Sequence, residues 1–171
     1  AVKELSRAMA TPTVGDWKKL KRLGRNLVGK PRVVTNYPWQ EEGMGLTGYS
    51  DSDWAGCKKT AKSTSGGVIQ RGEHYIRSWS STQKCITLSS GEAELIAMVK
   101  TSTEVMGVMQ LAEDWGLQMD GEILADSAVA LGVVKRKGCG KLRRVKVGQL
   151  WIQEKESNGE LKYQKVKGDL N

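Results

Sequence analysis

The sequence contains a single histidine, His74, among its 171 residues. This scarcity excludes a zinc site built from several imidazoles, and a Ser-His-Asp or Cys-His catalytic arrangement would have to include this one residue. His74 follows Gly72 and Glu73 in a pattern typical of a hairpin turn, so we expect an exposed turn histidine. If the protein catalyses a reaction, carboxylates and a metal ion are therefore the expected chemical groups.

Cysteines and long apolar segments are also scarce. The three cysteines, Cys57, Cys85 and Cys139, are widely spaced and form no Cys-x-x-Cys pair. We therefore expect reduced thiols in an intracellular protein, cytoplasmic or nuclear, rather than a zinc site. No apolar run approaches the roughly 20 residues that span a bilayer, and the first residues lack the features of a secretory signal. We expect a monomer that is neither secreted nor bound to a membrane.

Charge is distributed unevenly along the chain. Lys and Arg number 27 against 19 Asp and Glu, which gives a net charge of +8. Residues 1–35 carry a net charge of +7, residues 36–130 a net charge of −6, and residues 131–171 a net charge of +7. The basic ends favour a polyanionic partner such as nucleic acid. A polyanionic partner does not account for the net negative charge of residues 36–130.

The first part of the chain predicts a basic helix followed by a linker. Thr13 and Asp16 have the spacing of a capping box, and apolar residues then recur at helical intervals. The lysines and arginines between them would form either a solvated face or a surface for phosphates, and the sequence leaves both open. Residues 30–45 contain prolines and glycines that indicate a loop. We therefore divide the chain into a helical segment, residues 1–36, and a domain, residues 37–171.

The period of the apolar residues changes along this domain. Three short strands with short turns predict an antiparallel meander, and a helix, a strand, two helices and a last strand follow it. Ser89 and Glu92 have the spacing of a capping box at the start of the long helix. The order indicates an α/β domain. The expected strands are 46–49 (continuing toward Asp51), 68–71, 75–79, 123–125 and 161–166, and the expected helices are 89–115, 128–134 and 143–156.

Three acids lie at the starts or ends of these elements. Asp51 closes the first strand, Asp126 closes the fourth, and Glu94 lies early in the long helix. If the two strands are neighbours, a helix across the sheet could bring Glu94 opposite both aspartates. Clustered carboxylates repel one another, so the arrangement requires a cation, and hard oxygen ligands favour Mg²⁺. Taken singly, each acid has a structural alternative as a turn residue, a helix cap or a partner of the helix dipole.

Five motifs carry a resemblance to a known family. They are Gly48 to Cys57, Ser63 to Gly67, Ser78 to Lys84, Leu88 to Leu95 and Ala125 to Ala130. In sequence and in order they resemble the ribonuclease H domain of copia-type LTR retrotransposons. Residues 1–30 resemble the end of the reverse-transcriptase region that precedes this domain, so the resemblance covers nearly the whole chain.

The resemblance implies a fold, a reaction and a set of site residues. The fold is ribonuclease H-like, a mixed sheet of three antiparallel and two parallel strands flanked by helices. The reaction is endonucleolytic hydrolysis of the RNA strand of RNA–DNA hybrids with two Mg²⁺ ions, for which Mn²⁺ can substitute. Asp51, Glu94 and Asp126 correspond to three of the family's four metal-binding acids, whereas Asp53 and Glu92 resemble neighbours of these ligands. A reverse-transcriptase domain in cis is a further implied partner.

Two departures from the family pattern leave an alternative open. The sequence stops at Asn171, just short of the last family motif, an Ala-Asp pair that carries the fourth acid. Asp169 could substitute for that acid, but its position does not match. Residues 142–146 are basic where the family commonly has Thr-Lys-His-Ile. The alternative function is therefore a hybrid-binding module with impaired catalysis, and an integrase or transposase core is a more distant one. Polar groups that could contact sugars or phosphates are Gln83, Ser89, Ser90, Ser127 and Asn158.

Overall fold

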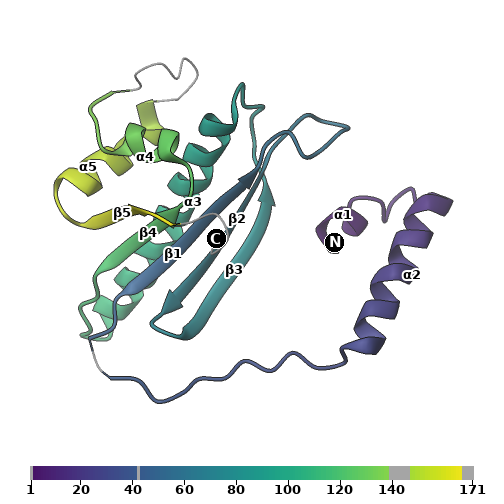
Figure 1. Cartoon of the computed structure of the whole chain (residues 1–171), viewed down its shortest axis with the longest axis horizontal. Helices are drawn as coiled ribbons and strands as arrows, with labels where there is room; N and C mark the ends of the chain where they lie inside the picture. The colour runs from purple at the N-terminus through teal and green to yellow at the C-terminus, as the bar shows by residue number, and fades with distance from the viewer. Residues whose placement is uncertain (1, 42, 139–146, 167–171) are drawn as a thin grey trace. The chain divides into compact units, whose positions relative to one another are not determined.

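The computed structural model describes residues 2–41, 43–138 and 147–166. The chain divides into two compact units, residues 1–36 and residues 37–171 (Figure 1). None of the helices in the described ranges combines the length and the apolar character that crossing a bilayer requires. The assignment of the first unit to the end of a reverse-transcriptase region stays a prediction.

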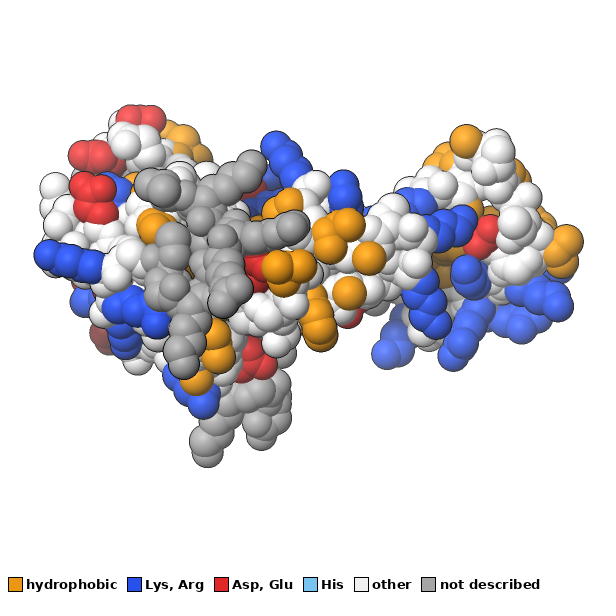
Figure 2. Space-filling view, turned by 90° about the horizontal axis from the view of Figure 1, so that it is seen from above, with side chains coloured by type: hydrophobic (Ala, Val, Ile, Leu, Met, Phe, Trp, Pro, Cys, Tyr) orange, Lys and Arg blue, Asp and Glu red, His pale blue; other side chains and the backbone are white. Residues whose placement is uncertain are grey.

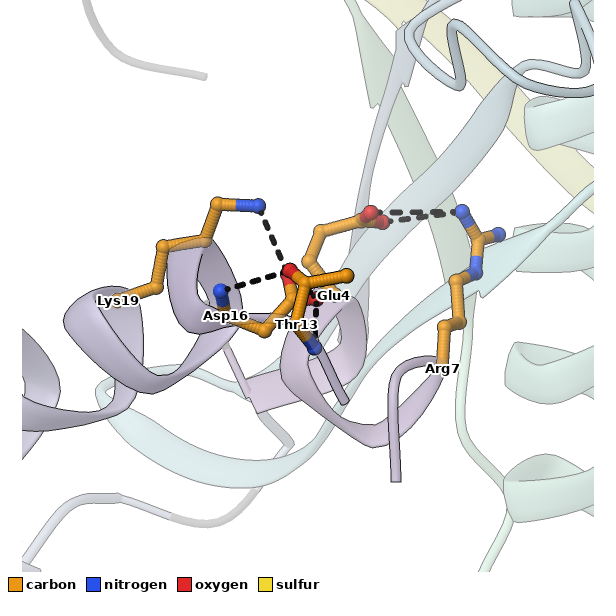
Figure 3. A network of polar contacts seen from close by, with 5 residues as sticks. All are labelled: Glu4, Arg7, Thr13, Asp16 and Lys19. Atoms are coloured by element: carbon orange, nitrogen blue, oxygen red, sulfur yellow. Dashed lines mark hydrogen bonds and ion pairs between the residues drawn. The ribbon is translucent and has the colours of Figure 1, made fainter. Parts of the chain in front are cut away.

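The first unit consists of two helices, α1 (Val2–Ser6) and α2 (Val14–Gly29). The predicted capping box of α2 is confirmed: Thr13 Oγ1 accepts a hydrogen bond from the Asp16 backbone N–H, and the Asp16 carboxylate accepts one from the Thr13 backbone N–H (Figure 3). Hydrogen bonds from Thr13 and Lys19 lower the pKa of Asp16 to about 2. The short helix α1, which the sequence did not predict, has no buried residue.

The second unit is built on a five-stranded sheet of order β3-β2-β1-β4-β5. β1 pairs antiparallel with β2, which pairs antiparallel with β3, whereas β4 lies parallel to both β1 and β5. The predicted mixed sheet is confirmed. The strands are β1 (Leu46–Asp53), β2 (Thr64–Arg71), β3 (His74–Thr82), β4 (Gly121–Ala125) and β5 (Leu161–Lys165).

The long helix α3 (Ser90–Asp114) packs against β1, β2 and β4 and lies behind the sheet in Figure 1. Its buried side chains include Leu95, Met98 and Val105, which belong to the hydrophobic core. α3 comes close to β1 at Gly48, where an added Cβ would lie 2.7 Å from Val105 Cγ2 and 2.9 Å from Thr101 Cγ2. Glycine at this position therefore sets the distance between helix and sheet.

Two shorter helices and a buried hydrogen bond complete the core. α4 (Ala128–Val134) packs against α3 and β5, and α5 (Trp151–Ser157) packs against α4 and β5. The Ser102 and Tyr163 hydroxyls lie 2.7 Å apart and join α3 to β5. Burial raises the pKa of Tyr163 well above its usual range.

The structure corrects the predicted basic helix over residues 143–156. Residues 143–146 lie outside the described ranges, and the rest forms a 3₁₀ turn, Val147–Gln149, followed by α5. Gly148 lies in this turn, and glycine is unfavourable inside a helix. Ile152 is the fully buried residue of α5.

His74 lies at the hairpin, as predicted, but it is half-buried rather than exposed. It is the first residue of β3, and its Nε2 lies 2.6 Å from the Pro38 carbonyl oxygen. Its Nδ1 lies 3.1 Å from Gln40 Nε2, and its ring meets the edge of Tyr37 at a centroid distance of 5.3 Å. The histidine therefore holds the preceding loop against the hairpin, which short-range sequence patterns cannot reveal.

Candidate metal centre

The parallel pairing of β1 and β4 places two of the predicted acids together. The ladder ends at the pair Ser50 and Ala125. Asp51 and Asp126 are the next residues on the two neighbouring strands. Because parallel strands end at the same edge of a sheet, both carboxylates lie at that edge.

The third acid lies near the N-terminal end of α3. Ser89 caps this helix, since its hydroxyl accepts a hydrogen bond from the Glu92 backbone N–H. Glu94 follows two residues later and is 8% exposed. The Ser52 hydroxyl donates a 2.6 Å hydrogen bond to Glu94 Oε1, which ties the helix end to β1.

Oxygen atoms of Asp51, Glu94 and Asp126, one from each carboxylate, all lie within 4.8 Å of one another. Glu94 Oε2 is buried and accepts no hydrogen bond from the described residues. A set of carboxylate oxygens with one buried, unsatisfied member suits a hard divalent cation such as Mg²⁺. The three residues therefore fit a divalent metal ion.

The electrostatic properties of the cluster favour the binding of a cation. Burial, together with the charges of Asp51 and Asp126, raises the pKa of Glu94 to about 7 against the opposing effect of the Ser52 hydrogen bond. A carboxyl group that is costly to ionise without a cation gains more from a bound cation than an exposed one does. The metal-free cluster is thus a source of local instability above neutral pH.

We expect the stability of the metal-free protein to depend on Glu94. Its pKa rises from 4.5 to about 7 on folding. Between these values the folded protein binds more protons than the unfolded chain, so the free energy of unfolding falls as pH rises and the loss is complete above pH 7. Because solvent partly screens the cluster, we expect a loss of about 1–2 kcal/mol. Urea unfolding in EDTA at pH 5 and pH 8 measures it.

The matched control for this prediction is Glu94→Gln, which keeps an oxygen for Ser52 but cannot ionise. Its free energy of unfolding should fall less between the two pH values, by the amount attributed to Glu94. Mg²⁺ should raise the melting temperature of the parent more at pH 8 than at pH 5, because only the ionised glutamate attracts the cation. An equal pH dependence in the parent and in Glu94→Gln would contradict the assignment.

The other acids of the motifs lie outside this cluster. Asp53 is an exposed residue at the end of β1. Glu92 is 6% exposed, and its carboxylate accepts a 2.7 Å hydrogen bond from the Leu88 backbone N–H. The expected capping box would pair the Glu92 carboxylate with the Ser89 backbone N–H. The carboxylate instead accepts its hydrogen bond from the preceding residue, Leu88. Asp169 lies outside the described residues.

The polar residues predicted as possible contacts to nucleic acid have mainly structural positions. Gln83 is 5% exposed, and its amide donates hydrogen bonds to Ser65 Oγ and to the Ala93 carbonyl oxygen. Ser127 caps α4 through a hydrogen bond from the Ala130 backbone N–H. Gln83 is therefore a buried link between β2 and α3 and no longer a candidate for contact.

Ser52 is the residue of this site that the sequence reasoning did not single out. It lies inside the motif between Asp51 and Asp53, and residues on a strand alternate between the two faces of a sheet. This alternation places Ser52 on the same face as the buried Ser50, which is the face toward α3. The alternation was therefore an available signal for the contact with Glu94.

Comparison with known proteins places this chain in a family. No family model matches the chain. The chain is 38% identical over 120 residues to the retrovirus-related Pol polyprotein from transposon RE2 of Arabidopsis thaliana, an alignment that covers 70% of this chain and 8% of the relative. It is 28% identical over 173 residues to the Pol polyprotein from transposon TNT 1-94 of Nicotiana tabacum, which covers 100% of this chain and 13% of the relative. The chain belongs to the copia-type retrotransposon Pol family.

Comparison with solved structures shows the fold of the second unit. A solved structure of LC11-RNase H1 matches with a TM-score of 0.50 at 16% identity and covers 74% of this chain and 88% of that chain. The second unit therefore has the ribonuclease H-like fold that the sequence predicted. The chain spans only about a tenth of the Pol relatives, at 8% and 13% of their lengths.

Proposed function

We propose that the chain is a ribonuclease H that hydrolyses the RNA strand of RNA–DNA hybrids with two divalent metal ions, Mg²⁺ or Mn²⁺. The observation that carries this proposal is the group of three carboxylates from β1, α3 and β4, whose oxygens lie within 4.8 Å of one another. The solved LC11-RNase H1 structure of the same fold is a complex with RNA/DNA hybrid, which supports the choice of substrate.

The residues of the chain have distinct parts in this proposal. Asp51, Glu94 and Asp126 would hold the metal ions, which when bound activate the attacking water and stabilise the leaving oxygen of the phosphodiester. Glu94 is buried and held by Ser52, so it would anchor the site. Asp51 is exposed and Asp126 half-buried, which leaves their side of the cluster open to substrate. The acidic cluster alone would repel a phosphate backbone.

The test combines cleavage and binding. We expect a labelled RNA–DNA hybrid to be cut in Mg²⁺ or Mn²⁺ and to stay intact in EDTA. Because the metal-free cluster repels phosphates, we expect hybrid affinity to fall about 10-fold when EDTA replaces the divalent ion at constant ionic strength. Equal affinity with and without the divalent ion would contradict the proposed place of the substrate.

A second candidate function is a hybrid-binding module that no longer cuts. The observation in its favour is that the cluster contains three acids among the described residues, whereas the family has four. Salt-sensitive hybrid binding without cleavage at millimolar Mn²⁺ would select this candidate. In either case we propose that the chain acts as a monomer, with a reverse-transcriptase region in cis.

A further inference from the structure

The loop between β1 and β2, residues 54–63, follows Asp51 closely along the chain. Figure 1 shows it extending beyond the ends of these two strands. Hydrogen bonds within the loop join the Cys57 backbone N–H to the Lys62 carbonyl oxygen and the Ala61 backbone N–H to the Cys57 carbonyl oxygen. Ala55 and Ala61 have φ values of +52° and +51°, a conformation that alanine adopts only when its surroundings impose it. The loop therefore has a defined shape.

A second loop, residues 83–89 between β3 and α3, holds the first one in place. The Trp54 Nε1–H donates a 3.3 Å hydrogen bond to the Thr87 carbonyl oxygen. The Ser63 and Thr87 hydroxyls also lie 2.9 Å apart, in a buried contact between the same two loops. Ser63 Oγ also accepts a hydrogen bond from the Ala55 backbone N–H. The two loops thus form one structure, and the position of the Trp54 ring is fixed by it.

The two loops carry both exposed lysines and exposed large apolar side chains. Trp54 is 50% exposed, and Ile86 and Leu88 are 50% and 61% exposed. Lys58, Lys59 and Lys84 are exposed and form no ion pair with a described residue. We call this set the loop surface. Its members are Trp54, Lys58, Lys59, Lys84, Ile86 and Leu88.

The space-filling view from above shows hydrophobic side chains beside lysines and acidic side chains in the middle of the visible face (Figure 2). Positive charge at the loop surface stands out because residues 36–130 carry a net charge of −6. Exposed lysines in the two loops, without acidic partners among the described residues, are available for phosphates. An indole ring among them offers a flat apolar face for a sugar or a base.

We propose that the loop surface binds the sugar–phosphate backbone of the nucleic acid next to the cleavage site, with Trp54 packed against the strand and the lysines on phosphates. This inference rests on the proposed function and adds the residues that hold the substrate. Three observations support the proposal. Trp54 lies three residues after Asp51, its ring is fixed before substrate arrives, and the surrounding charge is complementary to phosphate. Since a fixed ring loses little conformational entropy on binding, its contribution to affinity is favourable.

The first test measures hybrid affinity by fluorescence anisotropy in Mg²⁺, with every variant in an Asp51→Asn background so that the probe is not cut. We expect Trp54→Ala to weaken binding about 10-fold, in line with the loss of one aromatic contact to nucleic acid. Trp54→Phe keeps a ring and should lose less than about 3-fold. Trp115→Ala is the matched control, because Trp115 is 72% exposed at the far end of α3.

The second test uses the double variant Lys58→Gln/Lys59→Gln. Each lysine that neutralises a phosphate contributes about one to the slope of log affinity against log salt concentration. We therefore expect the slope to become shallower by one to two and the affinity to fall for all hybrid sequences alike. In the parent background, Trp54→Ala should raise KM and leave kcat nearly unchanged.

The outcomes separate this inference from the proposed function. If the parent cuts hybrids but Trp54→Ala behaves like Trp115→Ala and the salt slope is unchanged, the loop surface does not bind substrate and the proposed function stands. If the parent binds hybrids without cutting and the variants weaken that binding, the loop surface stands and the cleavage proposal falls. A parent that neither binds nor cuts hybrids overturns both.

Discussion

Asp51→Asn is expected to abolish hybrid cleavage, with a loss of at least about 1,000-fold in kcat/KM, while the protein stays folded. The amide retains the size of the carboxylate but carries no charge, so it would be a much weaker ligand for the divalent ions that the site is proposed to hold. A loss of this size corresponds to about 4 kcal/mol of transition-state stabilisation. The measurement is the initial rate on a labelled hybrid at saturating Mg²⁺, together with thermal unfolding.

Asp53→Asn is the matched control, since it makes the same chemical change two residues further along β1. Asp53 is exposed and does not belong to the three-carboxylate cluster. We expect its rate to stay within about 3-fold of the parent, a difference of less than 1 kcal/mol. Similar losses in the two variants would show that the reaction depends on the general acidity of this segment and not on a metal centre at Asp51.

Gly48→Val is expected to destabilise the protein by about 3 kcal/mol, which lowers the melting temperature by about 10 °C. Valine favours strands, so local propensity alone would predict a gain. The loss arises because an added Cβ would lie 2.7 Å from Val105 and 2.9 Å from Thr101, both on α3. Moving α3 away from β1 would also separate Glu94 from Asp51, so cleavage should decline together with stability.

Gly107→Val provides the comparison, because an added Cβ at Gly107 meets no atom within 4 Å on the exposed side of α3. Valine and glycine differ little in helix propensity, so we expect a change of less than about 0.5 kcal/mol. Chemical denaturation and melting curves of both variants give the two values. Equal stability of Gly48→Val and the parent would mean that the helix can shift without cost.

Much of the fold could be predicted from local patterns, and the residues show why. The sequence spacing correctly singled out Thr13 and Ser89, which are the N-caps of α2 and α3, because a cap is a contact over three positions. β2 was predicted too short: the segment Thr64–Gly67 has weak strand propensity but pairs with β1 on one side and β3 on the other. A central position in a sheet is a tertiary property that no short window contains.

Some features of the candidate site could likewise be predicted from the sequence, whereas others depend on tertiary packing. The identity of the three acids could be predicted from motifs and element ends, and the parallel pairing of β1 with β4 explains why Asp51 and Asp126 meet. The burial of Glu94, its raised pKa and its bond to Ser52 depend on how far α3 approaches β1. The half-buried environment of His74 also depends on residues distant in sequence, Pro38 and Gln40.

The parallel ladder between β1 and β4 has a consequence for the order of folding. It pairs residues 46–50 with residues 121–125, so the chain between them, which includes β2, β3 and α3, forms one long closed loop. Closing such a loop costs entropy that local hairpins do not have to overcome, and contacts of this range form slowly. On the ribosome, the β1–β3 meander can form early, whereas Asp126 cannot join Asp51 until β4 has emerged and paired with β1. A nascent chain therefore acquires its complete carboxylate cluster only after most of this domain has been synthesised.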